Sequence, residues 1–182
     1  MQHFACEDHY CAYPGELQSS ISVTTHAAHV LASCGADNRS ALAYLLERQL
    51  PDGRWPGDKW NGAWLYTTSH ALVALCHTPN HNAVMRAVEA LLAYQRPDGG
   101  WGSSHSSTEE TAYGVLGLRA VNASSFESPR VAVAQGRAER WMLDHYRPFA
   151  ESKDVCWLGK ETYRPRRLAR VIELASTLPT SA

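Results

Sequence analysis

The chain lacks several features that would place it in a common class of protein. No apolar stretch in its 182 residues approaches the roughly 20 residues that a membrane-spanning helix needs, so we expect no membrane span. Neither sign of charge is in excess, since 17 basic side chains accompany 18 acidic ones, and this balance argues against a nucleic-acid partner. The first residues lack the basic head and apolar run of a secretory signal. Together these absences favour a cytoplasmic protein.

Cysteine and histidine show no spacing that is typical of a metal site. The five cysteines are an odd number without a close pair motif, which favours reduced thiols over a disulfide framework. His26 and His29 lie three residues apart on an expected helix, but the spacing of the other residues suggests no third ligand. The sequence therefore predicts no metal site.

The chain does contain an internal repeat, and a repeat constrains the architecture before any local pattern is considered. Residues 41–55 and 87–101 share the pattern Ala-x-x-Tyr/Ala-Leu-x-x-x-Gln-x-Pro-Asp-Gly-x-Trp. The residues before each Gln have helical spacing, and Pro-Asp-Gly is typical of a tight turn. We expect the Gln to contact the start of the next helix and the Trp to help hold neighbouring helix pairs together. A degenerate third copy begins at Arg137.

Between the repeats, the sequence predicts a second kind of helix that is apolar and rich in small residues. These helices cover residues 68–75 and 111–118, whereas the repeat helices carry more charge. The alternation predicts an all-α fold in which about seven helices form about three inner and outer pairs, the pattern of a half-barrel of an α/α toroid. We treat residues 1–182 as one domain, with irregular structure expected at residues 1–20 and 179–182.

The repeat resembles the QW motif of triterpene cyclases and class II terpene cyclases. Four further blocks, in the same order along the chain, are similar to bacterial class II diterpene cyclases: residues 13–16 (Tyr-Pro-Gly-Glu), 52–72, 99–113 and 157–165. In that family these blocks follow the catalytic Asp-x-Asp-Asp motif. The resemblance therefore implies the C-terminal, QW-repeat region of a class II cyclase.

The catalytic acid of that family is absent from this sequence, in which no two aspartates are adjacent or one residue apart. Protonation of an alkene needs a carboxylic acid that stays protonated near neutral pH. The adjacent Glu109 and Glu110 are expected instead in the first turn of a helix, after a cap supplied by residues 106–108. We therefore expect a partner protein that carries Asp-x-Asp-Asp and the other half of the toroid. This chain would be one subunit of a split, heteromeric class II terpene cyclase.

The resemblance implies a linear prenyl diphosphate as the substrate, with geranylgeranyl diphosphate favoured over farnesyl diphosphate. Lys59 and Lys160 are the candidate diphosphate contacts, because an ammonium group binds an anion as a point charge. No tightly bound cofactor is expected, although Mg²⁺ is compatible with the diphosphate. The candidate side chains for stabilising a carbocation through their π faces are Trp60, Trp64, Tyr66 and Tyr113.

His29 and His70 are the candidate proton acceptors at the end of the reaction, and we expect both to be buried near the pocket. Two other functions remain open. The half-toroid is compatible with a non-catalytic isoprenoid-binding or interaction module. Asp154-x-Cys156 also resembles two zinc ligands of protein prenyltransferase β subunits, which share the toroid, but no histidine follows Cys156. A prenyltransferase-like zinc enzyme is therefore the weaker alternative.

Overall fold

The computed structural model describes residues 2–148, 150 and 166–179, and most of these residues are helical. The described residues contain no β-strand, and an isolated bridge pairs Ala5 with Tyr10. The prediction of an all-α chain with about seven helices is confirmed. Within these residues, a short 3₁₀ helix, η1 (Gln2–Phe4), precedes seven α-helices: α1 (Ile21–Ser33), α2 (Arg39–Glu47), α3 (Trp64–Leu75), α4 (His81–Tyr94), α5 (Thr108–Asn122), α6 (Pro129–His145) and α7 (Arg166–Thr177).

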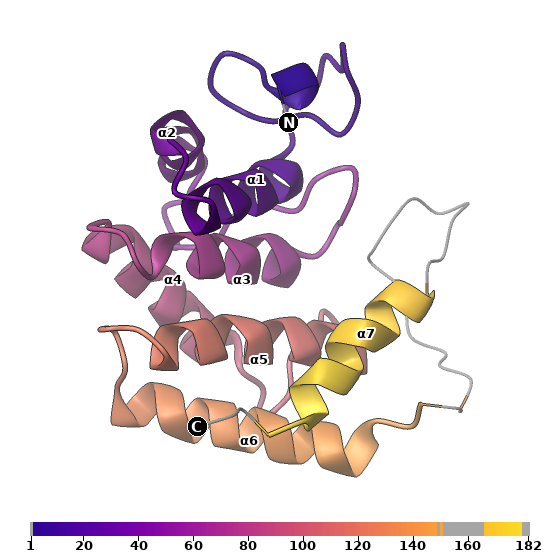
Figure 1. The fold of residues 1–182 in the computed structure, drawn as a ribbon. Coiled ribbons are helices and arrows are strands. Elements are labelled where there is room, and N and C mark those ends of the chain that lie inside the picture. The colour runs from indigo at the N-terminus through magenta and orange to yellow at the C-terminus, as the bar shows by residue number, and fades with distance from the viewer. Residues whose placement is uncertain (1, 149, 151–165, 180–182) are drawn as a thin grey trace.

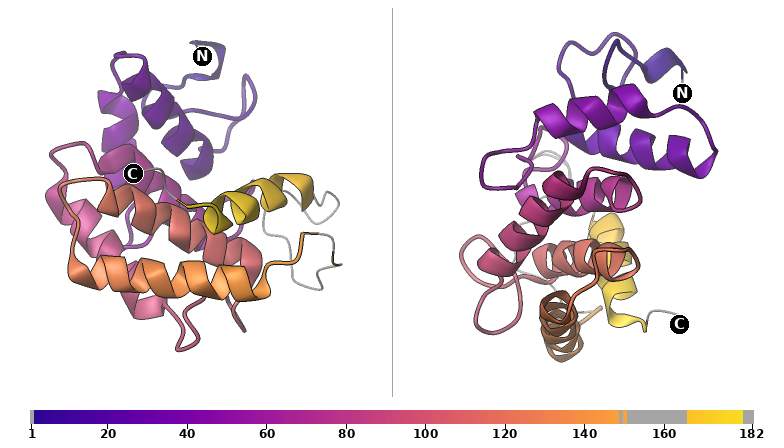
Figure 2. Two further views of the ribbon diagram at one scale, coloured as in Figure 1. Left: turned by 60° about the horizontal axis from the view of Figure 1, so that its bottom comes forward. Right: turned by 90° about the vertical axis from the view of Figure 1, so that its left-hand side faces the viewer.

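The helices form two layers (Figures 1 and 2). In the inner layer α1 packs on α3 and α3 packs on α5, so that the three helices lie side by side in that order. The outer helices α2, α4 and α6 pack behind them, and α7 crosses α5 and α6. The heads of the sequence repeat lie on α2, α4 and α6, as the alternation of apolar and charged helices predicts.

Serine side chains begin three of these helices. The hydroxyls of Ser20, Ser107 and Ser128 accept hydrogen bonds from main-chain N–H groups in the first turns of α1, α5 and α6. Such caps satisfy donors that a helix leaves unpaired at its N-terminus. At α5 the Ser107 hydroxyl also donates a 3.0 Å hydrogen bond to the Glu110 carboxylate, and Glu109 and Glu110 lie in the first turn, which confirms the predicted helix start at this pair.

The tryptophan of each repeat is fully buried and joins an outer helix to an inner one. The Trp55 indole donates a 2.6 Å hydrogen bond to the Leu45 carbonyl in α2, and its main-chain N–H donates to the Thr68 hydroxyl in α3. In the second repeat the equivalent bonds run from Trp101 to Leu91 and to Thr111. Each repeat therefore links its own outer helix to the inner helix that follows.

The glycine of each repeat turn cannot be replaced without strain. Gly53 and Gly99 have φ values of 91° and 100°, a left-handed conformation that side-chain-bearing residues rarely adopt. A Cβ atom at Gly53 would lie 2.2 Å from the Arg86 carbonyl oxygen, and one at Gly99 would lie 2.9 Å from that of Arg137. The main chain of each turn thus lies directly against the next outer helix.

Helix α7 exposes several large apolar side chains, whereas Ile172 is half-buried and packs against the core. Ala169, Glu173 and Ser176 are buried, and the Thr108 hydroxyl of α5 donates a 2.7 Å hydrogen bond to Glu173. Arg119 of α5 donates to main-chain carbonyls at the C-terminal end of α7. The α7 stripe, which we define as the exposed row along this helix and just past its end, consists of Leu168, Val171, Leu174 and Leu178.

Within the residues that the structure describes, no helix is both long enough and apolar enough to cross a membrane.

Candidate functional site

Four ring side chains from the three inner helices meet in what we call the inner cluster: His26 of α1, Tyr66 and His70 of α3, and Tyr113 of α5. The ring centroids of Tyr66 and His70 are 4.2 Å apart, and Tyr66 meets Tyr113 edge-on at 5.1 Å. His26 lies 4.5 Å from His70, and its Nε2 atom is 2.7 Å from the Tyr66 hydroxyl. Side chains from three helices thus form one aromatic cluster.

His70 is held as a neutral imidazole with a defined tautomer. Its Nδ1 lies 2.8 Å from the Tyr66 carbonyl oxygen, which can only accept, so Nδ1 carries the proton. The Nε2 atom is then left with a lone pair. Burial lowers the pKa of His70 to about 4, and the neighbouring His26 adds to this shift. Near neutral pH, Nε2 of His70 is therefore available as a proton acceptor.

Tyr66 and His26 are also held uncharged. Burial raises the pKa of Tyr66 to about 12, and the Asp58 carboxylate contributes to the rise. Partial burial also lowers the pKa of His26, which lies at the exposed edge of the cluster. The cluster thus presents neutral π faces and no nucleophilic anion from these three side chains.

Tyr113 forms the buried end of the cluster. Its hydroxyl donates a 2.9 Å hydrogen bond to Glu109, one helical turn earlier on α5, and both side chains are almost fully buried. Burial raises the pKa of Tyr113, the Glu109 carboxylate raises it further, and the adjacent Asn61 carboxamide opposes the rise. Asn61 is itself fully buried. The hydrogen bond to Glu109 fixes the orientation of the Tyr113 ring.

Asp58 anchors the loop before α3 to the start of α1. Its carboxylate accepts hydrogen bonds from the Ser20 hydroxyl, from both the hydroxyl and the N–H of Ser22, and from the N–H groups of Trp60 and Asn61. Burial alone would raise the pKa of Asp58, but these hydrogen bonds outweigh it and hold the pKa below its ordinary value. This carboxylate positions the loop that carries Lys59.

Lys59 is paired with a buried carboxylate. Its ammonium contacts Glu16, whose side chain is 4% exposed, and lies 5.1 Å from the centroid of the Trp60 ring. Burial would raise the pKa of Glu16, but Lys59 and the Ala12 N–H hold it below its ordinary value. The Lys59 side chain itself is 30% exposed. It therefore bonds within the chain while still reaching solvent.

An apolar groove of about 280 Å³ begins beside the inner cluster. It lies between the N-terminal segment and α1, and His26 is one of its walls. The remaining apolar lining includes Phe4, Tyr10, Val23, Ala27 and Val30.

Comparison with known proteins shows which family contains this chain. Residues 17–145 match the family described as the squalene-hopene cyclase C-terminal domain. The chain belongs to this family. It is 43% identical over 98% of its length to (+)-kolavenyl diphosphate synthase of Herpetosiphon aurantiacus, and 33% identical over 94% to terpentedienyl-diphosphate synthase of Kitasatospora griseola. The ent-copalyl diphosphate synthase structure from Streptomyces platensis superposes with a TM-score of 0.79 at 31% identity and covers 97% of the chain.

These relatives are class II terpene cyclases, so the chain is a C-terminal region of this enzyme family with the toroid fold that the QW repeats predict. It spans about a third of the relatives that it matches: 34% of the kolavenyl, 36% of the terpentedienyl and 37% of the ent-copalyl diphosphate synthase.

The structure brings together some of the residues predicted for this cyclase region and separates others. Tyr66, His70 and Tyr113 meet in the inner cluster, whereas Lys59 and Trp60 lie with Glu16 and Tyr13. Their roles toward a substrate stay predictions.

Trp64 and His29 lie apart from the inner cluster. Trp64 packs 5.2 Å from Tyr94 of α4, and the Arg54 guanidinium lies over both rings. The expectation that His29 is buried is wrong: α1 turns this side chain to solvent. Lys160, Asp154 and Cys156 lie outside the described residues.

Sequence reasoning missed His26 as a cluster member and Glu109 as the partner of Tyr113. The helical spacing of i and i+4 relates Glu109 to Tyr113 and Tyr66 to His70, and this spacing is the signal that would have paired them. The contact of His26 with Tyr66 joins two helices, so no local spacing could indicate it.

Proposed function

We propose that this chain is the C-terminal subunit of a split class II cyclase that acts on a linear prenyl diphosphate, with geranylgeranyl diphosphate favoured over farnesyl diphosphate. One observation carries the proposal: nearly the whole chain matches about a third of such cyclases, and the Asp-x-Asp-Asp acid occurs nowhere in its sequence. A separate chain that carries this motif would complete the pocket.

In this reaction the partner's carboxylic acid transfers its proton to the terminal alkene, and ring closures then move the positive charge along the chain. A π face stabilises such a cation without offering a nucleophile that would capture it. Tyr66 and Tyr113 offer such faces, since their pKa values are raised and both remain phenols. The inner cluster would line the pocket along the path of the migrating charge.

The reaction ends when a proton leaves a carbon next to the final cation and a base accepts it. His70 suits this step because its imidazole is neutral and its Nε2 lone pair is available. The proton given up by the partner's acid is thereby balanced by one taken up within the pocket. The diphosphate stays attached throughout, so the net reaction is an isomerisation.

The diphosphate would be held by lysine side chains. Lys59 reaches solvent at 30% exposure while bonded to Glu16, and Lys160 is the second candidate. Near Lys59, the Glu16 carboxylate is engaged by that lysine and the Asp58 carboxylate by main-chain and hydroxyl donors. These two carboxylates do not fit a Mg²⁺ site, and we assign no step to a metal ion.

The α7 stripe supplies a surface for the partner. Large apolar side chains in a continuous exposed row are typical of an interface, and the exposures of Leu168, Val171 and Leu174 are 59%, 65% and 49%. The occupant we propose is the Asp-x-Asp-Asp chain, which corresponds to the two thirds of the relatives that this chain does not cover.

Co-purification of tagged chain with Asp-x-Asp-Asp proteins of the same genome tests this interface. Leu174→Glu should abolish capture of the partner because it places a charge in the buried contact. Leu143→Glu on α6, at a site that is 63% exposed, is the matched control and should leave capture unchanged. Equal capture by both variants would refute the α7 stripe as the interface, and no capture by the unaltered chain would favour an isoprenoid-binding or interaction module.

A further inference from the structure

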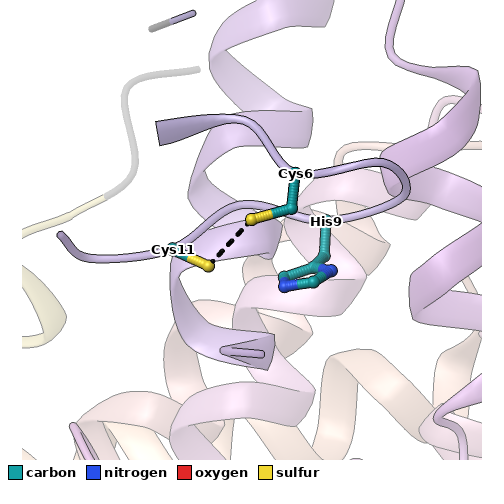
Figure 3. A group of neighbouring side chains, drawn as sticks. All are labelled: Cys6, His9 and Cys11. Carbon is teal, nitrogen blue, oxygen red and sulfur yellow. Dashed lines mark hydrogen bonds between the residues drawn. The ribbon is translucent and has the colours of Figure 1, made fainter. Parts of the chain in front are cut away.

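Three side chains with metal-binding atoms converge in the N-terminal segment, apart from the inner cluster. Cys6, His9 and Cys11 each offer one such atom, and these atoms all lie within 4.8 Å of one another. Figure 3 shows the two sulfur atoms side by side with the His9 ring turned toward them. The Sγ atoms are 3.1 Å apart, at hydrogen-bonding distance for two thiols.

The main chain of this segment is folded so that the three side chains are held together. The Cys6 N–H donates to the His9 carbonyl at 2.8 Å, which closes a turn, and the Cys11 N–H donates to the Phe4 carbonyl at 2.9 Å. The bridge between Ala5 and Tyr10 lies between these two bonds. The ligand spacing is thus set by main-chain hydrogen bonds as well as by side-chain contacts.

The orientation of His9 is fixed by two neighbours. Its Nδ1 lies 2.6 Å from a carboxylate oxygen of Asp8, and its ring stacks on Tyr44 of α2 at 5.3 Å. A carboxylate accepts the Nδ1 proton, so Nε2 is left with the lone pair that a metal needs. Pairing of a ligand histidine with a carboxylate is a recurrent feature of zinc sites.

The donor set is compatible with zinc and argues against the hard cations. Two thiolates and one imidazole are soft and borderline ligands, which suit zinc and not magnesium or calcium. Cys11 is 2% exposed, so its sulfur atom is enclosed by the protein. A dication would offset the cost of burying the thiolate, and two thiolates would balance its charge.

We propose that Cys6, His9 and Cys11 form a zinc site with three protein ligands and a fourth position open to solvent beside the exposed Cys6. On binding, each cysteine releases one proton, and the two sulfurs separate to the roughly 3.7 Å that tetrahedral Zn–S bonds of about 2.3 Å require. This site is independent of the proposed cyclase function. Because Tyr10 N–H bonds the Thr24 hydroxyl of α1, the metal would fix the N-terminal wall of the apolar groove against α1 and α2.

The test is the metal content of the full chain purified under reducing conditions with zinc, followed by removal of unbound metal. The expected result is one zinc per chain, with zinc lost in Cys6→Ser and His9→Asn. Asp8→Asn should retain the site with affinity about 10–100-fold weaker. Cys34→Ser is the matched control, because Cys34 is exposed and outside the cluster, and it should bind zinc fully.

Cobalt substitution provides a readout that does not depend on variants folding. Co²⁺ bound by these thiolates should give the unaltered chain a thiolate-to-metal charge-transfer band and the strong visible bands of a tetrahedral site. Three outcomes would overturn the proposal: no stoichiometric zinc together with no cobalt spectrum, equal zinc in Cys6→Ser and Cys34→Ser, or a Cys6–Cys11 disulfide that persists under those reducing conditions.

Discussion

Gln95, at the end of α4, donates a 2.8 Å hydrogen bond to the main-chain carbonyl of Ala134 in α6. The same Nε2 also donates to the carbonyl of Gly99 at 2.9 Å. One amide group therefore joins the outer helices α4 and α6 and the repeat turn that contains Gly99. Gln49 makes the equivalent bonds to Ala83 in α4 and to Gly53. The glutamine of the repeat thus links each outer helix to the next outer helix. The tryptophan links the outer layer to the inner layer.

Replacement of Gln95 by alanine should destabilise the fold. Two carbonyl groups in a half-buried position would lose their donor, which costs about 1–3 kcal/mol of unfolding free energy and lowers Tm by about 2–4 °C for each kcal/mol. Chemical denaturation of the variant measures this loss. Gln18→Ala is the control, since Gln18 is exposed and should change stability little. Equal stability of both variants would show that the link contributes nothing.

Two glycine-to-alanine substitutions should have opposite effects. Gly99→Ala forces a left-handed residue against the Arg137 carbonyl and should cost at least about 1–2 kcal/mol. Gly136→Ala lies on α6 with open space around its Cβ position and should stabilise the chain by about 0.5–1 kcal/mol. Thermal denaturation of both proteins checks the sign of each change, and a stabilising Gly99→Ala would contradict the turn geometry.

The stability of the chain should depend on pH through His70. Its pKa of about 4 in the fold lies below the ordinary value of 6.5, so the unfolded chain binds a proton that the folded chain does not. The contribution of His70 to the unfolding free energy is complete well above pH 6.5. It falls as the pH drops toward 4, with a limiting slope of about 1.4 kcal/mol per pH unit. The slope approaches this limit only between the two pKa values, where the unfolded chain is protonated at His70 and the folded chain is not.

His70→Asn isolates this contribution from the carboxylates that titrate in the same range. The unfolding free energy of the variant, subtracted from that of the unaltered chain, should shrink between pH 6.5 and pH 4. A difference that stays constant over this interval would show that His70 is not held neutral by the fold.

The repeat predicted most of the fold because its residues act locally and recur. The turn at Gly53 and the link that Trp55 makes between the outer and inner layers follow from short patterns. The expectation that each Gln contacts the start of the next helix along the chain is wrong, because Gln49 bonds Ala83 in α4, 34 residues away, and skips α3. Such a contact depends on how helices pack and not on spacing.

The site was harder to predict than the fold for the same reason. The sequence assigned Tyr66 and Trp64 the same role, yet Tyr66 meets Tyr113 in the inner layer and Trp64, two residues earlier, packs on Tyr94 of the outer layer. Residues two apart on a helix point in widely different directions. The convergence of Cys6, His9 and Cys11 was likewise not predicted, because it depends on how main-chain hydrogen bonds fold the N-terminal segment.

Tyr66 should act in cyclisation through its ring. In the assembled cyclase, Tyr66→Leu removes a π face worth about 2 kcal/mol when desolvated, which corresponds to about a 30-fold fall in kcat. Tyr66→Phe keeps the π face and loses only the hydroxyl contact with His26, so its kcat should fall much less. Turnover of geranylgeranyl diphosphate by both variants decides between these outcomes. Similar losses in both would assign Tyr66 to hydrogen bonding or packing instead.

The central claim is that this chain completes a cyclase whose acid lies on another chain. The most direct measurement is product formation from geranylgeranyl and farnesyl diphosphate by the chain alone, by an Asp-x-Asp-Asp protein of the same genome alone, and by the two co-expressed. We predict cyclised diphosphate only from the co-expressed pair, with turnover abolished when the partner's motif is changed to asparagines. Full activity of the Asp-x-Asp-Asp protein alone, or no activity from any pair, would contradict the claim.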